Sequence, residues 1–250
     1  CIVPDYAMIA CARAVTLAGH FPKFVDVCAD DLLLDTSLIA AANDYLTDGS
    51  PSIKVIMSVA TYGRIDESDR QYISDVCEEW DAFFIEDLAE AHGVKPHQGT
   101  DAACWSFYRN KIIAGEEGGA VWFANPAHAA LARQLRSLGF TPDHDYQHIP
   151  RGHNYRMSNL HASYIINEGV VVYNRNSLRH YERNLVKRRE IEGWYDSYLP
   201  QEWRMAPRQA PWVYDLRIPR MDHTIQSRLI KALRLGGGDA RHGFKPLSAQ

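Results

Sequence analysis

The alternation of short apolar runs with amphipathic stretches most constrains what this chain can fold into. A strand, a helix and a second strand in succession form a βαβ unit, whose two strands run parallel. The sequence therefore predicts an α/β fold with a mostly parallel sheet flanked by helices. The predicted strands cover residues 23–27, 53–59, 82–86, 104–108, 119–123 and 212–218. The predicted helices cover residues 6–18, 38–46, 67–80, 126–138 and 223–233.

The region 158–198 differs from the rest of the chain because it is long, helical and rich in Arg, Glu and Tyr. Such a segment is typical of a helix that joins two domains. We place the domain boundary near residue 170, between a large domain at 1–170 and a smaller α+β domain at 171–250. The chain opens with CIVP and closes with PLSAQ, which we interpret as an internal fragment of a longer protein, truncated at both ends.

Composition excludes several classes of function. The net charge of −4 argues against nucleic acid or an anionic membrane as the main partner. No apolar stretch is long enough to span a bilayer, and no basic region precedes the first apolar run, as a signal peptide would require. The five cysteines are odd in number and form no CxxC pair, which favours reduced thiols and a cytoplasmic location.

Asp87 and Lys111 each follow a predicted strand. Asp87 comes directly after the strand 82–86, and Lys111 lies between the strand 104–108 and the Gly-rich segment 115–119. Ligands of open α/β sheets bind beyond the carboxyl ends of the strands. A lysine that is desolvated there loses proton affinity and becomes a usable nucleophile. The competing interpretations are a helix N-cap for Asp87 and an ordinary solvated side chain for Lys111.

Sequence blocks around these residues occur in a specific order. They are VPDY at 3–6, FVDV at 24–27, IEDLAEAHG at 85–93, SFYRNK at 106–111, GEEGG at 115–119 and GHNYRMSNL at 152–160. The series resembles the nucleotide-sugar aminotransferases, a branch of the fold type I enzymes that depend on pyridoxal 5'-phosphate (PLP), within the aspartate aminotransferase superfamily. The resemblance covers nearly the whole chain. It implies the PLP-dependent transferase fold type I and PLP as the cofactor.

The resemblance also implies roles for individual residues. Lys111 would bind PLP covalently and carry protons during amino transfer, while Asp87 would pair with the protonated pyridine nitrogen. Ser106 would bind the cofactor phosphate, and Glu90 would lie near the phenolic oxygen of the ring. Met8 occupies a position where relatives often have an aromatic residue that stacks on the ring.

A homodimer is the active unit that the resemblance implies, because Asn154 would reach the cofactor phosphate of the neighbouring subunit. Alternatively, Asn154 caps the helix that begins near Ser158, and Ser106 is an ordinary hydroxyl at a strand end. The implied reaction moves an amino group from an amino acid, with glutamate as the expected donor, to a keto sugar nucleotide. Such reactions serve polysaccharide or sugar biosynthesis.

Departures from the family keep other functions open. Relatives carry, ahead of the block at 3–6, a turn that binds the cofactor phosphate at a helix start, and this turn is absent from the sequence. A truncated, non-catalytic fold that binds no cofactor is therefore one alternative. A PLP-dependent sugar dehydratase is another, although relatives that dehydrate replace the lysine by His. A nicotinamide enzyme would need a GxGxxG turn, which is absent.

Several histidines resemble metal ligands at first sight. His92 has no second ligand at metal spacing, so it is interpreted as a packing or polar contact. His144, His148 and His153 lie in a polar loop. We predict no metal site.

Overall fold

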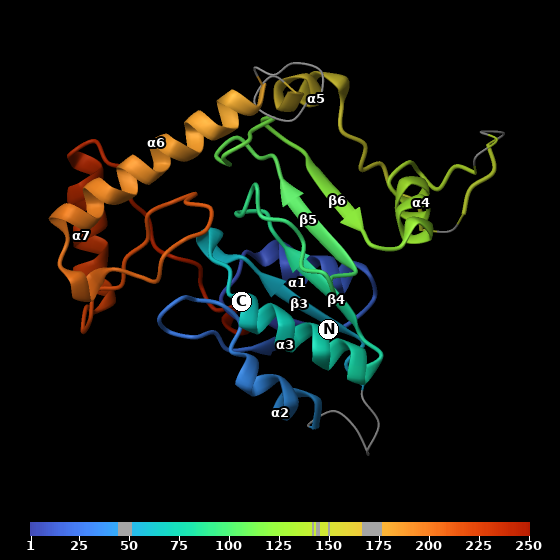
Figure 1. The fold of residues 1–250 in the computed structure, drawn as a ribbon, viewed down its shortest axis with the longest axis horizontal. Coiled ribbons are helices and arrows are strands. Elements are labelled where there is room, and N and C mark those ends of the chain that lie inside the picture. The colour runs from blue at the N-terminus through green and yellow to red at the C-terminus, as the bar shows by residue number, and fades with distance from the viewer. Residues whose placement is uncertain (45–51, 142, 144–145, 150, 167–176) are drawn as a thin grey trace.

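The computed structural model describes residues 1–44, 52–141, 143, 146–149, 151–166 and 177–250. Among these residues, six strands form one sheet in the order β2-β1-β3-β4-β5-β6 (Figure 1). The strands are β1 (Ile2–Pro4), β2 (Lys23–Val25), β3 (Val55–Val59), β4 (Phe83–Asp87), β5 (Ala102–Ser106) and β6 (Gly119–Phe123). Neighbouring strands run parallel except β5 and β6, which are antiparallel. The predicted α/β class and mostly parallel sheet are confirmed.

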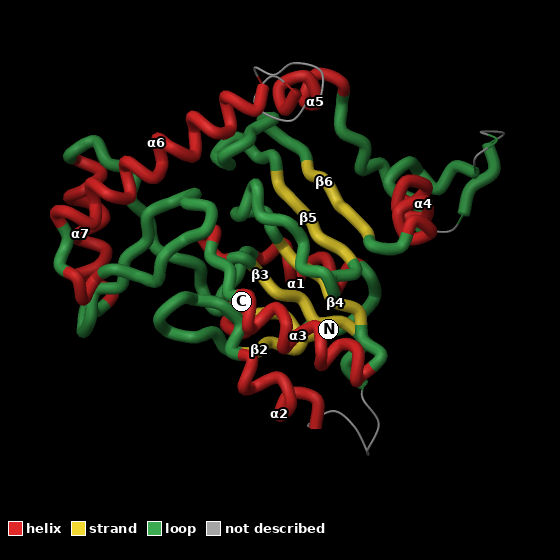
Figure 2. Tube along the Cα trace, in the orientation of Figure 1, coloured by secondary structure: helices red, strands yellow, loops and turns green. Residues whose placement is uncertain are grey.

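Helices lie on both faces of the sheet and extend beyond it (Figure 2). The described α-helices are α1 (Ile9–Leu17), α2 (Ile39–Asp44), α3 (Glu67–Trp80), α4 (Pro126–Leu135), α5 (Asn159–Ile165), α6 (Ser177–Tyr198) and α7 (His223–Leu235). Short 3₁₀ helices occur at η1 (Thr36–Leu38), η2 (Thr61–Gly63), η4 (Gln201–Trp203) and η5 (Leu247–Ala249). None of the described helices combines the length and the apolar character that a membrane span requires.

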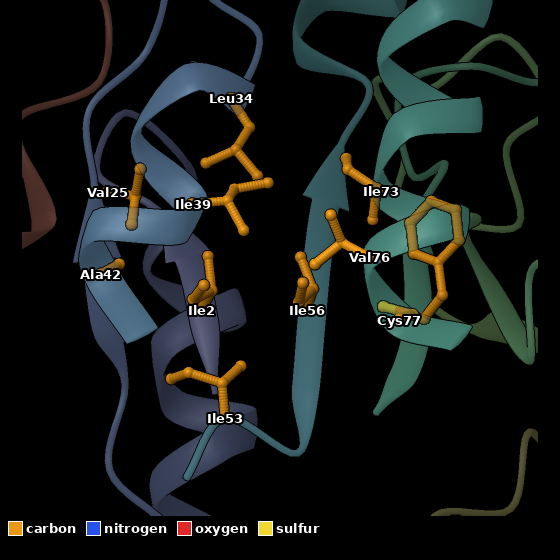
Figure 3. Packing of buried hydrophobic residues seen from close by; sticks show 11 residues of the cluster. Ile2, Val25, Leu34, Ile39, Ala42, Ile53, Ile56, Ile73, Val76 and Cys77 are labelled. Carbon is orange, nitrogen blue, oxygen red and sulfur yellow. The ribbon is translucent and has the colours of Figure 1, made fainter. Parts of the chain in front are cut away.

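One face of the sheet is covered by α2 and α3. Asp66 caps the start of α3 by accepting hydrogen bonds from the backbone N–H groups of Ser68 and Asp69. Figure 3 shows Ile2 and Ile56, from neighbouring strands, between side chains of the α2 and α3 regions. Burial of this apolar stripe determines where α3 packs.

A buried ion pair lies on the same face. Arg70 of α3 donates to Glu86 of β4 through Nε at 2.7 Å and through Nη2 at 3.2 Å. The hydroxyl of Thr100 and the backbone N–H of His97 donate to the same carboxylate at 2.6 and 2.8 Å. Because four donors meet its two oxygens, the buried charge of Glu86 is fully compensated. The pair anchors the loop that follows β4 onto α3.

The other face is covered by α1, whose Cys11, Ala12 and Val15 pack on Val3, Met57 and Val59 of the sheet. Ile85 of β4 packs against this cluster. Side chains alternate across a strand, so Asp87 lies on the same face, two positions further along β4.

The C-terminal part of the chain returns to the sheet after α6, the long helix that Figure 1 shows running from α5 to α7. Asp215 accepts a hydrogen bond from Arg64, which follows η2, at 2.7 Å, and a second arginine, Arg208, also donates to it. The last residues return to β1, where Leu247 donates its backbone N–H to the carbonyl of Asp5 at 2.7 Å. The C-terminal part of the chain therefore contacts residues that follow β1 and β3.

The predicted strand at 212–218 was wrong. Arg204 and Leu216 form a single antiparallel bridge, and no strand forms in the described residues 177–250. The side chains of this segment instead have separate partners: Trp212 is buried against the site described below, and Asp215 pairs with arginines. Neighbouring residues are thus held by side-chain contacts rather than by a strand ladder.

Other boundaries moved by smaller amounts. The strand predicted at 104–108 is β5 at Ala102–Ser106, because its ladder with β6 ends at the Ser106–Gly119 pair. The predicted helical region 158–198 forms α5 and α6. Residues 167–176 lie outside the described part, and so does the predicted domain boundary near 170. Residues 45–46 of the predicted helix at 38–46 also lie outside it.

Candidate active site at the carboxyl edge of the sheet

Asp87 is the last residue of β4, at the carboxyl edge of the parallel strands. Its Oδ1 accepts a hydrogen bond from the backbone N–H of Ala89 at 2.9 Å, and its Oδ2 accepts one from the thiol of Cys11 at 3.2 Å. The Ala89 contact is a local turn of the kind that aspartates form with the backbone two residues on. No helix begins there in the described residues, so the N-cap interpretation of Asp87 was wrong.

Lys111 lies in the loop between β5 and β6, and its amine is covered on two sides. The Nζ atom is 3.8 Å from the ring centroid of Trp212 and 3.6 Å from Oε1 of Glu90. Trp212 is held in place by its indole N–H, which donates to the carbonyl of Asn110 at 2.6 Å. Only 10% of the Lys111 side chain is exposed, so the interpretation as a solvated loop lysine was wrong.

Burial lowers the pKa of Lys111, and the carboxylates of Glu90 and Asp87 partly oppose this shift. The guanidinium of Arg241 lowers the pKa further. A lowered pKa increases the fraction of neutral amine, which is the nucleophilic form. Lys111 and Asp87 follow or end the neighbouring parallel strands β5 and β4, so the amine and the carboxylate belong to the same edge of the sheet.

Glu90 lies in the loop after β4 and is buried beside the amine. Its Oε2 accepts a hydrogen bond from the backbone N–H of Tyr62 at 2.7 Å. Burial raises the pKa of Glu90 to about 7, and the charge of Lys111 opposes this rise. The carboxyl group can therefore gain or lose a proton near neutral pH, at a position next to Lys111.

Replacing Glu90 by glutamine is expected to remove a pH dependence of stability. A carboxyl group with a raised pKa stabilises the folded state below its ordinary pKa of 4.5, and this contribution is lost as the pH rises through about 7. The loss corresponds to about 3 kcal/mol in the free energy of unfolding. Urea unfolding at about pH 5 and about pH 8 measures it. The exposed Glu67→Gln serves as the control. Equal pH dependence in the Glu90→Gln variant and the unaltered chain would contradict the prediction.

Ser106 and Met8 lie at the same edge of the sheet. Ser106 ends β5, and its Oγ accepts a hydrogen bond from the backbone N–H of Tyr108 at 3.2 Å. Met8 directly precedes α1, and its Sδ accepts one from the N–H of Ala10 at 3.2 Å. Half of Met8 is exposed. The edge thus brings together Lys111, Asp87, Glu90, Ser106 and Met8.

Asn154 lies elsewhere, beside the residues that follow α4. It forms a bridge with Ser137, and its side-chain oxygen accepts a hydrogen bond from Arg156 at 3.1 Å. The helix that begins after it, α5, is capped by Ser158 and not by Asn154. The capping interpretation of Asn154 was therefore wrong.

The histidines that resemble metal ligands in the sequence have separate environments in the structure. His92 is buried with its ring stacked on Phe107 at 5.8 Å, and burial together with the charge of Lys111 lowers its pKa to about 4. The ring of His148 contacts the carbonyl of Leu138 at 2.9 Å, and the ring of His153 stacks on Tyr155. His144 lies outside the described residues. Among the described residues, no three side chains of ligand type gather at one point.

Sequence reasoning assigned no role to the aromatic residues that enclose the site. Tyr62 stacks on Phe244 with ring centroids 5.5 Å apart, and the hydroxyls of Tyr6 and Tyr62 lie 3.0 Å apart. The backbone N–H of Phe244 donates to the Tyr6 hydroxyl at 3.0 Å. Trp212 and its partner Asn110 are 102 positions apart in the chain. No local pattern marks residues that meet over such separations.

The sequence of the chain is similar to those of known proteins. The sequence profile of the "DegT/DnrJ/EryC1/StrS aminotransferase family" matches residues 1–249. The chain is 30% identical over 259 aligned positions to the GDP-perosamine synthase of Caulobacter vibrioides, covering 98% of this chain and 65% of that protein. It is 34% identical over 155 positions to the dTDP-3-amino-3,4,6-trideoxy-alpha-D-glucose transaminase of Micromonospora megalomicea, covering 60% and 39%.

The fold matches solved structures as well. The crystal structure of a DegT DnrJ EryC1 StrS aminotransferase from Brucella abortus superposes with a TM-score of 0.83 at 23% identity, covering 100% of this chain and 66% of that one. The expected PLP-dependent transferase fold is therefore confirmed. The chain spans about two thirds of the length of the relatives that it matches over its whole extent.

Proposed function

The chain belongs to the DegT/DnrJ/EryC1/StrS aminotransferase family, and from this premise we propose that it is part of a PLP-dependent aminotransferase. Its substrates would be a keto sugar nucleotide and an amino-acid donor, with glutamate as the donor. The observation that carries the proposal is the buried, half-enclosed amine of Lys111, which shares an edge of the sheet with Asp87. The names of two relatives, GDP-perosamine synthase and dTDP-3-amino-3,4,6-trideoxy-alpha-D-glucose transaminase, support the substrate class.

The residues at this edge fit PLP. The amine of Lys111 has a lowered pKa, as a covalent bond to an aldehyde requires. Asp87 offers a carboxylate on the same edge, and Ser106 offers a hydroxyl at the end of the neighbouring strand. PLP, when bound, supplies an aldehyde and an electron-withdrawing ring.

Lys111 and Glu90 would move protons. In its neutral form, the Nζ of Lys111 removes the proton from the donor carbon that carries the amino group. Glu90 Oε1 lies 3.6 Å from Nζ and has a pKa of about 7, which suits it to exchange a proton with Lys111. The Trp212 ring covers Nζ and excludes water from it.

Asp87, Ser106 and Met8 would bind and orient the cofactor. The carboxylate of Asp87 would hold the proton on the ring nitrogen, Ser106 Oγ would donate to the phosphate, and Met8 would lie against the ring. Asn154 lies apart from these residues, and its role would be to reach the cofactor phosphate of a second copy in a homodimer. Free thiols in all five cysteines are consistent with a cytoplasmic enzyme.

Chemical trapping tests the proposal. We expect the chain to take up PLP, to show a visible absorption band, and to lose that band on reduction with borohydride. Peptide mass spectrometry is expected to locate the reduced adduct on Lys111. Lys54, an exposed lysine in a surface ion pair, is the internal control. An adduct spread over surface lysines, or no band at all, would favour a non-catalytic fold that binds no cofactor.

A further inference from the structure

The Asp87 carboxylate is held by the protein on the side of α1. Each of its two oxygens accepts a hydrogen bond: Oδ1 from the N–H of Ala89 at 2.9 Å, and Oδ2 from the thiol of Cys11 at 3.2 Å. Cys11 is buried on the inner side of α1. A carboxylate with a partner on each oxygen has a fixed orientation, and lone pairs remain for one further donor.

A second thiol, that of Cys104, approaches the same carboxylate from β5. Cys104 is the register partner of Asp87 across the β4–β5 ladder, so the two side chains lie on the same face of the sheet. Burial raises the pKa of the Cys104 thiol, and the charge and hydrogen bonding of Asp87 raise it further. The pKa of Cys11 is raised in the same way. Both sulfurs therefore stay protonated and can act as donors.

Thiols suit this position because they are weak donors. A strong donor stabilises the charged form of a carboxylate and lowers its affinity for a proton. A thiol restricts the orientation of the carboxylate with a smaller effect of this kind. The carboxylate then keeps most of its charge for a stronger partner.

We propose that Cys11 and Cys104 are positioning residues, which hold the Asp87 carboxylate in the orientation that binds the protonated ring nitrogen of PLP. This inference rests on the proposed function. The two thiols contact neither substrate nor cofactor and act only through Asp87. The buried Cys77 provides a matched comparison, since it belongs to α3 and packs on the opposite face of the sheet.

Infrared spectroscopy of the cofactor-free chain tests the contact itself. The S–H stretching band moves to lower frequency when a thiol donates to a carboxylate. Difference spectra against Cys11→Ala and Cys104→Ala isolate the two bands, and Asp87→Ala is expected to move both to the frequency of a thiol without an acceptor. The Cys77 band, isolated with Cys77→Ala, should not respond to Asp87→Ala. Bands of Cys11 and Cys104 that are also insensitive to Asp87 would overturn the proposal.

The PLP-loaded chain tests the role. We use PLP labelled with ¹⁵N in the ring, whose chemical shift reports whether the ring nitrogen is protonated. In Cys11→Ala/Cys104→Ala, we expect the ring nitrogen to lose its proton at lower pH and PLP to bind about five-fold more weakly for each donor removed. Serine at both positions should restore the orientation of the carboxylate and most of the protonation of the ring nitrogen, because a hydroxyl is again a donor, although a stronger one than a thiol. Cys77→Ala should match the unaltered chain.

The outcomes separate this inference from the proposed function. A PLP adduct on Lys111 with an unchanged ring-nitrogen titration in the double alanine variant leaves the function standing and overturns the role of the thiols. No PLP uptake by the unaltered chain overturns the function, and with it any role of the thiols toward a cofactor. Circular dichroism of each variant identifies loss of fold, in which case the serine variants decide.

Discussion

The Lys111→Ala variant is expected to lose the amino-donor half-reaction almost completely. In the unaltered chain loaded with PLP, glutamate should convert the visible band as its amino group is transferred. Without the Nζ of Lys111, both the covalent link and the proton carrier are missing, so we expect the rate to fall on the order of 10⁴-fold. Stopped-flow absorbance, with PLP supplied in excess, measures this rate.

Lys54→Ala is the matched control, since Lys54 has a similar side chain but forms only an exposed pair with Asp81. Its rate should stay within about two-fold of the unaltered chain, because exposed ion pairs contribute little. A Lys111→Ala variant that retained a tenth of the rate would exclude Lys111 as the proton carrier. A slow variant that still binds PLP reversibly would instead separate the role of Lys111 in chemistry from its role in binding.

Removing Arg70 should destabilise the fold strongly. In Arg70→Ala, the carboxylate of Glu86, which is 1% exposed in the structure, loses its main counter-charge. A buried charge left without its partner costs about 3–5 kcal/mol in the free energy of unfolding. Urea unfolding, followed by circular dichroism, measures this change through the midpoint at constant slope.

Two comparisons show whether the cause is the unpaired charge. Glu67→Ala removes the exposed partner of the same arginine, 2.7 Å from Nη1, and should cost less than about 1 kcal/mol. The double variant Arg70→Met/Glu86→Leu should be more stable than Arg70→Ala, because no buried charge remains. If the double variant were no more stable than Arg70→Ala, the loss of packing rather than the unpaired charge would be the main cause of the destabilisation.

Sequence reasoning was most successful where the determinants are local. The helix predicted at 67–80 matches α3 because its capping Asp66 and its apolar spacing lie within a few turns. The strand predicted at 119–123 matches β6. Asp87 and Lys111 could be placed at one edge because parallel strands share their carboxyl ends.

The missed features depend on distant contacts. The enclosure of Lys111 by Trp212 and the second donor of Asp87, Cys11, join residues from separate elements. The segment 212–218 has the residue pattern of a strand, but its side chains bind partners in other parts of the chain. Local periodicity carries no information about such partners. A strand was therefore predicted where the structure has a loop held by side-chain contacts.

The contacts between the C-terminal part of the chain and earlier segments also have a consequence for its synthesis. Trp212 reaches Asn110, Asp215 reaches Arg64, and Leu247 reaches Asp5. Synthesis proceeds from the N-terminus, so the strands of the sheet are made before the C-terminal residues that enclose the carboxyl edge of the sheet. Contacts of such sequence separation form slowly, and apolar surface exposed in the meantime favours aggregation. Co-translational protection by chaperones should raise the yield of folded protein more than it does for a chain with local contacts.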